Sequence, residues 1–252
     1  MTLRKTVYWG LGLLVVTVLT FIYWPTHGVP VLAYHKISND DSIYSIDKEL
    51  FDRQMKYLAE HGYTAISLDQ MAAGLAGKQK LPDRPVVITF DDGYLDNYTT
   101  ALPILEKYGL RAAIFITVDK VGQPGYLSWQ QINDMQVRGA DIGSHTLSHA
   151  ALTDVTPAQR EREVLQSKTI LDAHLKKPIE FIAYPHGKFD AALSELLKSS
   201  GYQGAFSGVT GFNSTGANTY QLKRISILRP KYDIWSFQVR LTKAAVYSKL
   251  GI

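Results

Sequence analysis

The sequence predicts an α/β protein, a single barrel-like domain in which strands and helices alternate, and three observations predict this fold class. Short apolar runs rich in β-branched residues recur from residue 29 onward, and stretches of helical periodicity lie between them. Strands that alternate with helices pair in parallel, because each helix carries the chain back to the start of the next strand. About eight strands in 224 residues (252 − 28), without an internal repeat or a shift in composition, suit one barrel.

The first element is an uncharged, apolar stretch of 18 residues over positions 7–24. Aromatic residues lie near both ends, and the length falls within the roughly 17–25 residues that a membrane-spanning helix needs. Arg4 and Lys5 precede the stretch and would stay on the cytoplasmic side. No small-x-small cleavage site follows, so we expect residues 1–28 to be an uncleaved, single-pass transmembrane anchor, with a cleaved signal peptide as the alternative. The second segment, residues 29–252, would then lie outside the cell membrane, either extracellular or periplasmic.

The strands and helices of the body follow from local patterns. In the helix expected over residues 48–61, Leu50, Met55 and Leu58 fall on one face, and Gly62 ends the helix. The predicted strands are residues 29–34, 65–68, 86–90, 112–117, 140–144, 181–184, 204–207 and 225–228. The predicted helices include residues 48–61, 98–108, 129–138, 157–175 and 191–200.

The composition excludes several classes of protein. The chain has no cysteine, which excludes a disulfide framework, a thiolate zinc site and a cysteine nucleophile. Residues 29–252 carry 25 Lys and Arg against 23 Asp and Glu, a net charge of 25 − 23 = +2. The sequence shows neither a basic run with interleaved aromatic residues nor a glycine-rich phosphate loop. We therefore expect no nucleic-acid or dinucleotide partner. The sequence carries no signal for an oligomeric state.

Two adjacent carboxylates directly follow the strand predicted over residues 86–90. Asp91 and Asp92 come before Gly93, at the carboxyl end of the strand, where parallel α/β folds collect their chemistry. Neighbouring acids repel, and a metal bound to one of them would keep both ionised. An ordinary Asp-Gly turn with solvated side chains is the alternative for such a motif alone.

Two histidines follow the strand predicted over residues 140–144. His145 and His149 are four residues apart, and a helical turn would put both imidazoles on one face, where a pair of histidines grips a metal. Two unrelated surface histidines are the alternative. One carboxylate and two imidazoles, each just past a strand, make a three-ligand metal site, and the second aspartate stays free as a base.

A third loop has the same placement, because the strand predicted over residues 181–184 runs into Pro185, His186 and Gly187. Proline and glycine fix a tight loop, which can aim a backbone N–H at a developing oxyanion. Tyr184 and Trp129 are candidates for stacking on sugar rings, with core packing as the alternative for each.

The motifs resemble those of the polysaccharide deacetylases of carbohydrate esterase family 4, which share the NodB homology domain. Residues 89–93 (Thr-Phe-Asp-Asp-Gly) match the first motif of that family, and residues 144–149 (Ser-His-Thr-Leu-Ser-His) match the second. The resemblance implies a distorted (β/α) barrel and a divalent metal, usually zinc, with cobalt, nickel or manganese as alternatives. It also implies the hydrolysis of N-acetyl groups on amino-sugar polymers. By position, Asp91 would be the general base, Asp92, His145 and His149 the metal ligands, and the backbone N–H at His186 an oxyanion donor.

The sequence departs from this family pattern in its later motifs. Ala183 and His186 stand where the third motif commonly has arginine and tyrosine, and neither an Asp-x-x-Asp-Trp nor a Leu-x-His motif follows. Tyr34 and His35, at the end of the first strand, resemble the branch that contains the poly-N-acetylglucosamine deacetylases of biofilms. In that branch the acid histidine comes from the start of the domain, so His35 is the candidate general acid. Arg224 is the candidate replacement for the arginine beside Asp91.

These observations predict a membrane-anchored, metal-dependent hydrolase that removes N-acetyl groups from an extracellular or cell-envelope polymer of N-acetylglucosamine. Deacetylation of peptidoglycan or of chitin oligomers is the alternative substrate class. A non-catalytic envelope protein that only binds glycan is the alternative from another class. Against that alternative, the metal ligands and the base that hydrolysis needs are all present, and a binding protein has no evident need for a free base beside a metal.

Overall fold

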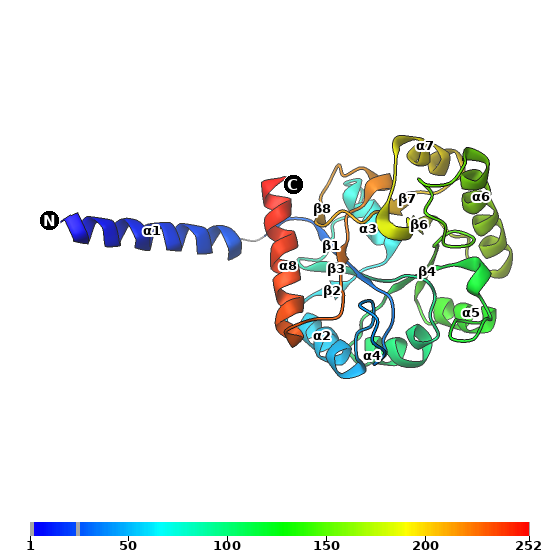
Figure 1. Ribbon diagram of the computed structural model, residues 1–252, viewed down its shortest axis with the longest axis horizontal. Coiled ribbons are helices and arrows are strands. Elements are labelled where there is room, and N and C mark those ends of the chain that lie inside the picture. Colours follow the sequence, from blue (N-terminus) through cyan, green and yellow to red (C-terminus); the bar gives the residue numbers. More distant parts are fainter. Residues whose placement is uncertain (1–2, 24–25, 252) are drawn as a thin grey trace.

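The computed structural model describes residues 3–23 and 26–251, and its central feature is a curled sheet of nine strands with helices packed around it (Figure 1). The strands are β1 (Val29–Tyr34), β2 (Thr64–Ala65), β3 (Pro85–Phe90), β4 (Ala113–Ile116), β5 (Asp141–Ser144), β6 (Phe181–Ala183), β7 (Gly204–Phe206), β8 (Phe212–Asn213) and β9 (Ile225–Ser226). The helices are α1 (Leu3–Tyr23), α2 (Lys48–Glu60), α3 (Leu68–Leu75), α4 (Leu102–Lys107), α5 (Trp129–Val137), α6 (Pro157–His174), α7 (Ala191–Ser199) and α8 (Asp233–Leu250). The predicted α/β class is confirmed.

The sheet is a barrel that does not close. Its order is β7-β6-β5-β4-β3-β1-β8, while β2 pairs with β3 and β9 with β1. All of these pairs are parallel except β1 with β8, which is antiparallel. β7 and β8 lie at opposite ends of the order, and a single bridge between Phe206 and Leu222 connects β7 to the segment that precedes β9. This open seam is the distortion in the predicted distorted (β/α) barrel.

The core has two layers, one on each face of the sheet. Leu32, Ile88 and Ile114 belong to the layer between the sheet and the surrounding helices. Val31 and Val87, at the alternate positions, face the concave side and join an inner cluster with Phe115, Phe181 and Phe206. Because both faces of the strands are buried, the strands read as continuous apolar runs in the sequence.

Two helices and one strand were not among the predicted elements. α3 begins where a strand over residues 65–68 was predicted, because Ser67 starts the helix. Its hydroxyl accepts from the N–H of Gln70 at 3.0 Å, and the Gln70 side chain accepts from the N–H of Ser67 at 2.9 Å. The other elements missing from the prediction are α8 and the two-residue strand β8.

The N-terminal segment forms the helix α1, which extends away from the domain (Figure 1), and large apolar side chains such as Trp9 and Leu13 are 74% and 70% exposed. Within residues 3–23 and 26–251, no helix has both the length and the apolar character that a membrane crossing requires. The structure therefore does not bear out the transmembrane helix predicted over residues 7–24. Trp24, the last residue of the predicted stretch, lies outside the described residues.

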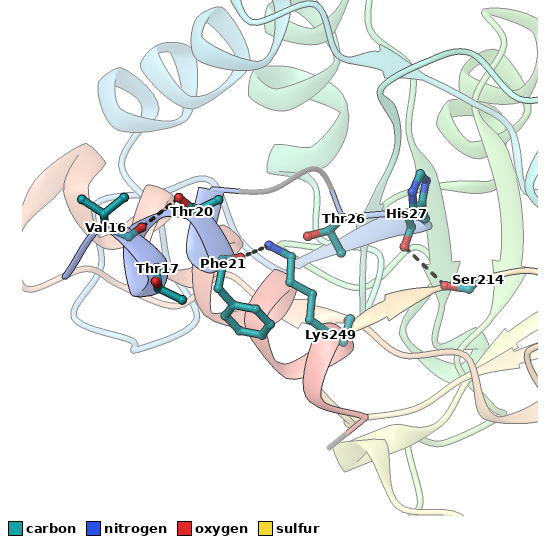
Figure 2. A pocket seen from close by; sticks show the side chains of 9 residues that line it. Val16, Thr17, Thr20, Phe21, Thr26, His27, Ser214 and Lys249 are labelled. Carbon is teal, nitrogen blue, oxygen red and sulfur yellow. Dashed lines mark hydrogen bonds between the residues drawn. The ribbon is translucent and has the colours of Figure 1, made fainter. Parts of the chain in front are cut away.

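The end of α1 lies beside the end of α8 (Figure 2). The ammonium group of Lys249 donates to the carbonyl oxygens of Phe21 and Ile22, at 2.6 and 3.0 Å. These carbonyls belong to the last turn of α1, where a cation is favourable. A hollow of about 710 Å³ lies between the two helices and the loop around Ser214, and none of the predicted site residues lines it.

Candidate active site

The two adjacent aspartates leave β3 at the carboxyl edge of the sheet. The N–H of Asp91 donates to the carbonyl oxygen of Tyr34 at 2.9 Å and so continues the pairing of β3 with β1. Asp92 and Gly93 both have left-handed backbones, with φ of 72° and 77°. Two such residues in succession turn the chain sharply, so that the two carboxylates serve different neighbours.

Asp91 is buried at 2% exposure, and its neighbour is Arg224, which is 6% exposed. The guanidinium Nη1 of Arg224 lies 2.7 Å from Oδ1 of Asp91, and the Nε donates to the carbonyl oxygen of Ser207. Arg224 directly precedes β9, which pairs with β1. The structure thus places Arg224 beside Asp91. Arg224 stands in for the arginine that the third motif of the family commonly has and that this sequence lacks there.

The pKa values of both carboxyls are lowered. Burial alone would raise the pKa of Asp91, but the charge of Arg224 and the nearby imidazoles outweigh burial and hold this pKa well below its ordinary range. Burial likewise opposes ionisation of Asp92, while the hydrogen bond from His149 and the charge of His145 lower the Asp92 pKa. Both side chains are therefore carboxylates at neutral pH, and Asp91 is able to accept a proton.

Asp92, His145 and His149 form the candidate metal centre, and one ligand atom from each lies within 4.8 Å of the others. Oδ1 of Asp92 is 3.2 Å from Nε2 of His149 and 3.6 Å from Nε2 of His145. Two imidazoles and one carboxylate are a donor set that suits zinc and other first-row divalent metals. The residues present therefore fit the metal that the motifs imply.

The orientation of His145 also fits a metal ligand. Its Nδ1 lies 2.8 Å from the carbonyl oxygen of Ala183, which fixes Nδ1 as the donor and leaves the lone pair of Nε2 toward Asp92. Burial lowers the pKa of His145, which favours the neutral ring, the form that binds metal. The hydrogen bond to Asp92 raises the pKa of His149.

The two histidines meet through a loop, whereas the spacing suggested a helical turn. Thr146 and His149 both have a φ of 68°, which lies in the left-handed region and interrupts any helix. The hydroxyl of Ser144 accepts from the N–H of Thr146 at 3.0 Å, and the Thr146 hydroxyl accepts from the N–H of His149 at 3.1 Å. Side-chain oxygens therefore shape this loop, and its shape brings the imidazoles together.

His35 follows β1 and lies across Asp91 from Arg224. Its Nε2 is 3.9 Å from Oδ2 of Asp91, and its side chain is 19% exposed. The Nδ1 of His35 is buried and has no hydrogen-bond partner among the described residues. The ring packs against Tyr44 with a centroid distance of 4.7 Å. His35 therefore lies at the mouth of the site, within reach of a group held between Asp91 and solvent.

Pro185, His186 and Gly187 form a tight turn on the other side of the metal ligands. His186 is exposed, has a φ of 58°, and places its ring 5.0 Å from the ring of His149. A Cβ at Gly187 would come within 2.4 Å of the backbone of Gly208, so only glycine fits there. The turn therefore holds His186 at the rim of the metal site.

Two predicted sugar-stacking candidates do not reach the site. Tyr184 is fully buried and its hydroxyl donates to the carbonyl oxygen of Tyr220 at 3.0 Å, so the ring is unavailable to substrate. Trp129 packs against the main core and stacks on His174 at 4.2 Å. Both rings have the packing role that the sequence left open as the alternative.

Three tyrosines at the site were not predicted. Tyr94 follows Asp91-Asp92-Gly93 directly, and its ring stacks on Tyr126 at 5.0 Å. Burial and the charge of Asp92 raise the pKa of Tyr94 well above its ordinary value, so the hydroxyl keeps its proton. Tyr44, 45% exposed, covers His35. Only Tyr94 carried a sequence signal, its place in the Asp-Asp-Gly loop.

The fold and the site together define a hydrolase class, an incomplete (β/α) barrel with one free carboxylate beside an Asp-His-His centre. The comparisons with known proteins agree with this class. The sequence model of the polysaccharide deacetylase family matches residues 78–205. The chain is 33% identical over 199 residues to the Bacillus subtilis protein YxkH, which is named for the same family, covering 79% of this chain and 71% of that protein. This chain belongs to the polysaccharide deacetylase family.

Other relatives have more specific names. The Escherichia coli poly-β-1,6-N-acetyl-D-glucosamine N-deacetylase is 25% identical over 80% of this chain, and the alignment spans only 36% of the E. coli protein. Among solved structures, the Streptococcus pyogenes deacetylase PplD, in complex with acetate, has a TM-score of 0.78 at 26% identity, covering 86% of this chain and 99% of PplD. IcaB from Ammonifex degensii has a TM-score of 0.75 at 28% identity, covering 87% of this chain and 97% of IcaB.

Proposed function

We propose that this protein is a metal-dependent N-deacetylase of a poly-N-acetylglucosamine polymer. The observation that carries the proposal is the separation of tasks at the end of β3. Asp92 faces two imidazoles as a ligand, while Asp91 faces Arg224 and stays free to act as a base. A glycan-binding protein has no need of an ionised, buried carboxylate beside a metal site.

The residues of the chain have distinct roles in this proposal. A divalent cation held by Asp92, His145 and His149 would lower the pKa of a water molecule and polarise the acetamide carbonyl. Asp91 accepts the proton of the attacking water, since its carboxylate is ionised and oriented by Arg224.

Two groups act on the rest of the acetamide. His35, within 3.9 Å of Asp91, donates a proton to the nitrogen of the departing amine. The backbone N–H of His186, in the tight turn beside His149, donates to the oxygen of the reacting carbonyl. His35 supplies the acid that the missing Leu-x-His motif would otherwise supply.

The substrate class rests on the first strand and on the relatives. The proposed acid histidine directly follows β1, and relatives that match 80% of this chain are named poly-β-1,6-N-acetyl-D-glucosamine N-deacetylases. Tyr44 is exposed next to His35, and aromatic rings complement the apolar faces of sugars. We therefore place a β-1,6-linked polymer ahead of peptidoglycan and of chitin oligomers.

We also propose that the protein works at the outer face of the cell membrane, where such a polymer is found. The support is α1, whose large apolar side chains are exposed along its length, including Leu13 at 70% and Val16 at 60%. Exposed apolar surface of this extent marks an interaction with lipid or protein. Fractionation of cells tests this location, because recovery of the full chain in the soluble cytoplasmic fraction would contradict it.

Acetate release from N-acetylglucosamine oligomers tests the activity. The chain is loaded with zinc, cobalt, nickel or manganese and given β-1,6-linked or β-1,4-linked oligomers, with Asp91→Asn as the inactive control. We expect metal-dependent release, faster with the β-1,6 linkage. Faster release with the β-1,4 linkage would assign chitin oligomers or peptidoglycan instead. Tight binding of oligomers without release under any metal would favour the non-catalytic glycan-binding protein.

A further inference from the structure

Glu163, in the middle of α6, is a buried carboxylate that the proposed reaction does not use. It is 8% exposed, and no lysine, arginine or histidine among the described residues pairs with it. Its two oxygens instead accept from Ser148, at 2.8 Å from the backbone N–H and 2.6 Å from the hydroxyl. Burial of a carboxylate without a cation is costly, and an apolar side chain would fill the space at a lower cost.

Ser148 directly precedes the metal ligand His149. Non-glycine residues in the left-handed region, such as Thr146 and His149, are strained and persist only where their surroundings fix them. The two hydrogen bonds to Glu163 fix the backbone and the side chain of Ser148 together. They therefore fix the chain at the residue directly before His149.

Other polar contacts tie the same face of α6 to the same loop. Ser167, one helical turn after Glu163, accepts from the hydroxyl of Ser144 at 2.9 Å. Arg160, one turn before Glu163, donates to the carbonyl oxygen of Leu152 at 2.8 Å. The face of α6 that carries residues 160, 163 and 167 thus follows the chain from residue 144 to residue 152.

We propose that Glu163 is a positioning residue of the metal centre, which acts through Ser148 to hold His149 in its ligating orientation. The inference rests on the proposed metal site and names a residue that the family motifs do not contain. Partners that orient metal ligands typically change metal affinity by 10–100-fold when they are removed. We expect Glu163→Gln to weaken zinc binding by about this factor, because an amide accepts at only one of its two ends.

The test measures the zinc and cobalt affinities of the full chain by competition with a chromophoric chelator. Glu161→Gln, an exposed glutamate of the same helix, is the matched control and should bind like wild type. Ser148→Ala should weaken zinc binding as well. Because this substitution removes only one hydroxyl group, it can test the inference even where Glu163→Gln does not fold. The zinc affinity of the double variant should be close to that of the weaker single variant, since both changes act on the contact between residues 148 and 163.

The outcomes separate the inference from the function on which it rests. Wild-type affinity in Glu163→Gln, even with a lower melting temperature, would show that Glu163 only stabilises the fold. Additive losses in the double variant would show that Glu163 does not act through Ser148. If the wild-type chain itself bound neither metal, the proposed metal centre would fail, and this inference with it.

Discussion

The two sides of the active site are held very differently. On the side of β3 and β5, Asp91 and His145 are each 2% exposed, and each is fixed by a hydrogen bond to a distant part of the chain. On the side of β1 and the turn after β6, His35 is 19% exposed with an unpartnered Nδ1, and His186 is exposed. The difference teaches that the candidate base and one candidate metal ligand are fixed by the fold itself, whereas the candidate acid and the turn at His186 are less constrained.

The largest expected effect comes from variants that distinguish the roles of the two adjacent aspartates, Asp91 and Asp92, on the constrained side. Asp91→Asn removes the base and should lower kcat/KM for acetate release by about 10³–10⁴-fold while zinc binding stays intact. Asp92→Asn removes a ligand and should lower zinc affinity as well. Chelator competition and acetate release on the same samples measure both effects. Loss of zinc from Asp91→Asn together with its retention by Asp92→Asn would reverse the two roles.

The buried ion pair provides the next largest effect. Arg224→Met leaves Asp91 buried without its cation and should lower the free energy of unfolding at pH 7 by about 3–5 kcal/mol, measured by urea denaturation. Arg229→Met, which removes an exposed pair with Asp41, should cost about 0–1 kcal/mol. Equal losses in the two variants would contradict the buried pairing.

The same variant has a defined pH dependence. Folding lowers the pKa of Asp91, so the stabilisation by Arg224 is complete above the unfolded-state pKa and disappears as the pH falls through the folded-state pKa. The stability difference between wild type and Arg224→Met should therefore shrink in acid. A difference that grew on acidification would contradict this assignment.

On the less constrained side, replacing His35 should slow the hydrolysis of one class of substrate and leave another nearly unchanged. His35→Ala should slow the deacetylation of an amide by about 10²–10³-fold, because the amine must leave with a proton. An aryl acetate has a leaving group that needs no proton, so its hydrolysis by the same variant should change little. Equal losses on both substrates would show that His35 supports the site without acting as the acid.

The smallest effect should come from the exposed rim. Tyr44→Ala should raise KM for N-acetylglucosamine oligomers by about 2–10-fold with kcat nearly unchanged, the size of one aromatic contact. Tyr232→Ala changes another exposed tyrosine, at the start of α8, and should have no effect. A fall in kcat in Tyr44→Ala would show that the ring also orients His35.

The sequence predicted the position of a residue at a strand end where one short segment carries all the information. Asp91 and Asp92 follow a continuous apolar strand, and His145 and His149 lie four residues apart after another, so local patterns were enough. α3 was missed for the opposite reason. Its first residue, Leu68, ends a short apolar run typical of a strand, and the side chain of Ser67 starts a helix by capping it.

Contacts between distant segments could be predicted only in part. The strand position of Arg224 suggested its role, but the 2.7 Å contact with Asp91 depends on the pairing of β9 with β1. Tyr184 is buried and Tyr44 is exposed because of how their segments pack against the rest of the chain. The residue pattern within one segment does not contain this information.

The open seam of the barrel also has a consequence for the order of assembly. Arg224 belongs to the segment that spans this seam, 133 residues after Asp91, and it joins the site only when the last strand adds to β1. During synthesis, a chain that has already made both aspartates and both histidines still lacks the cation that keeps the buried base ionised. The enzyme should therefore become competent late, after most of its barrel has formed, so that hydrolysis awaits the completed domain.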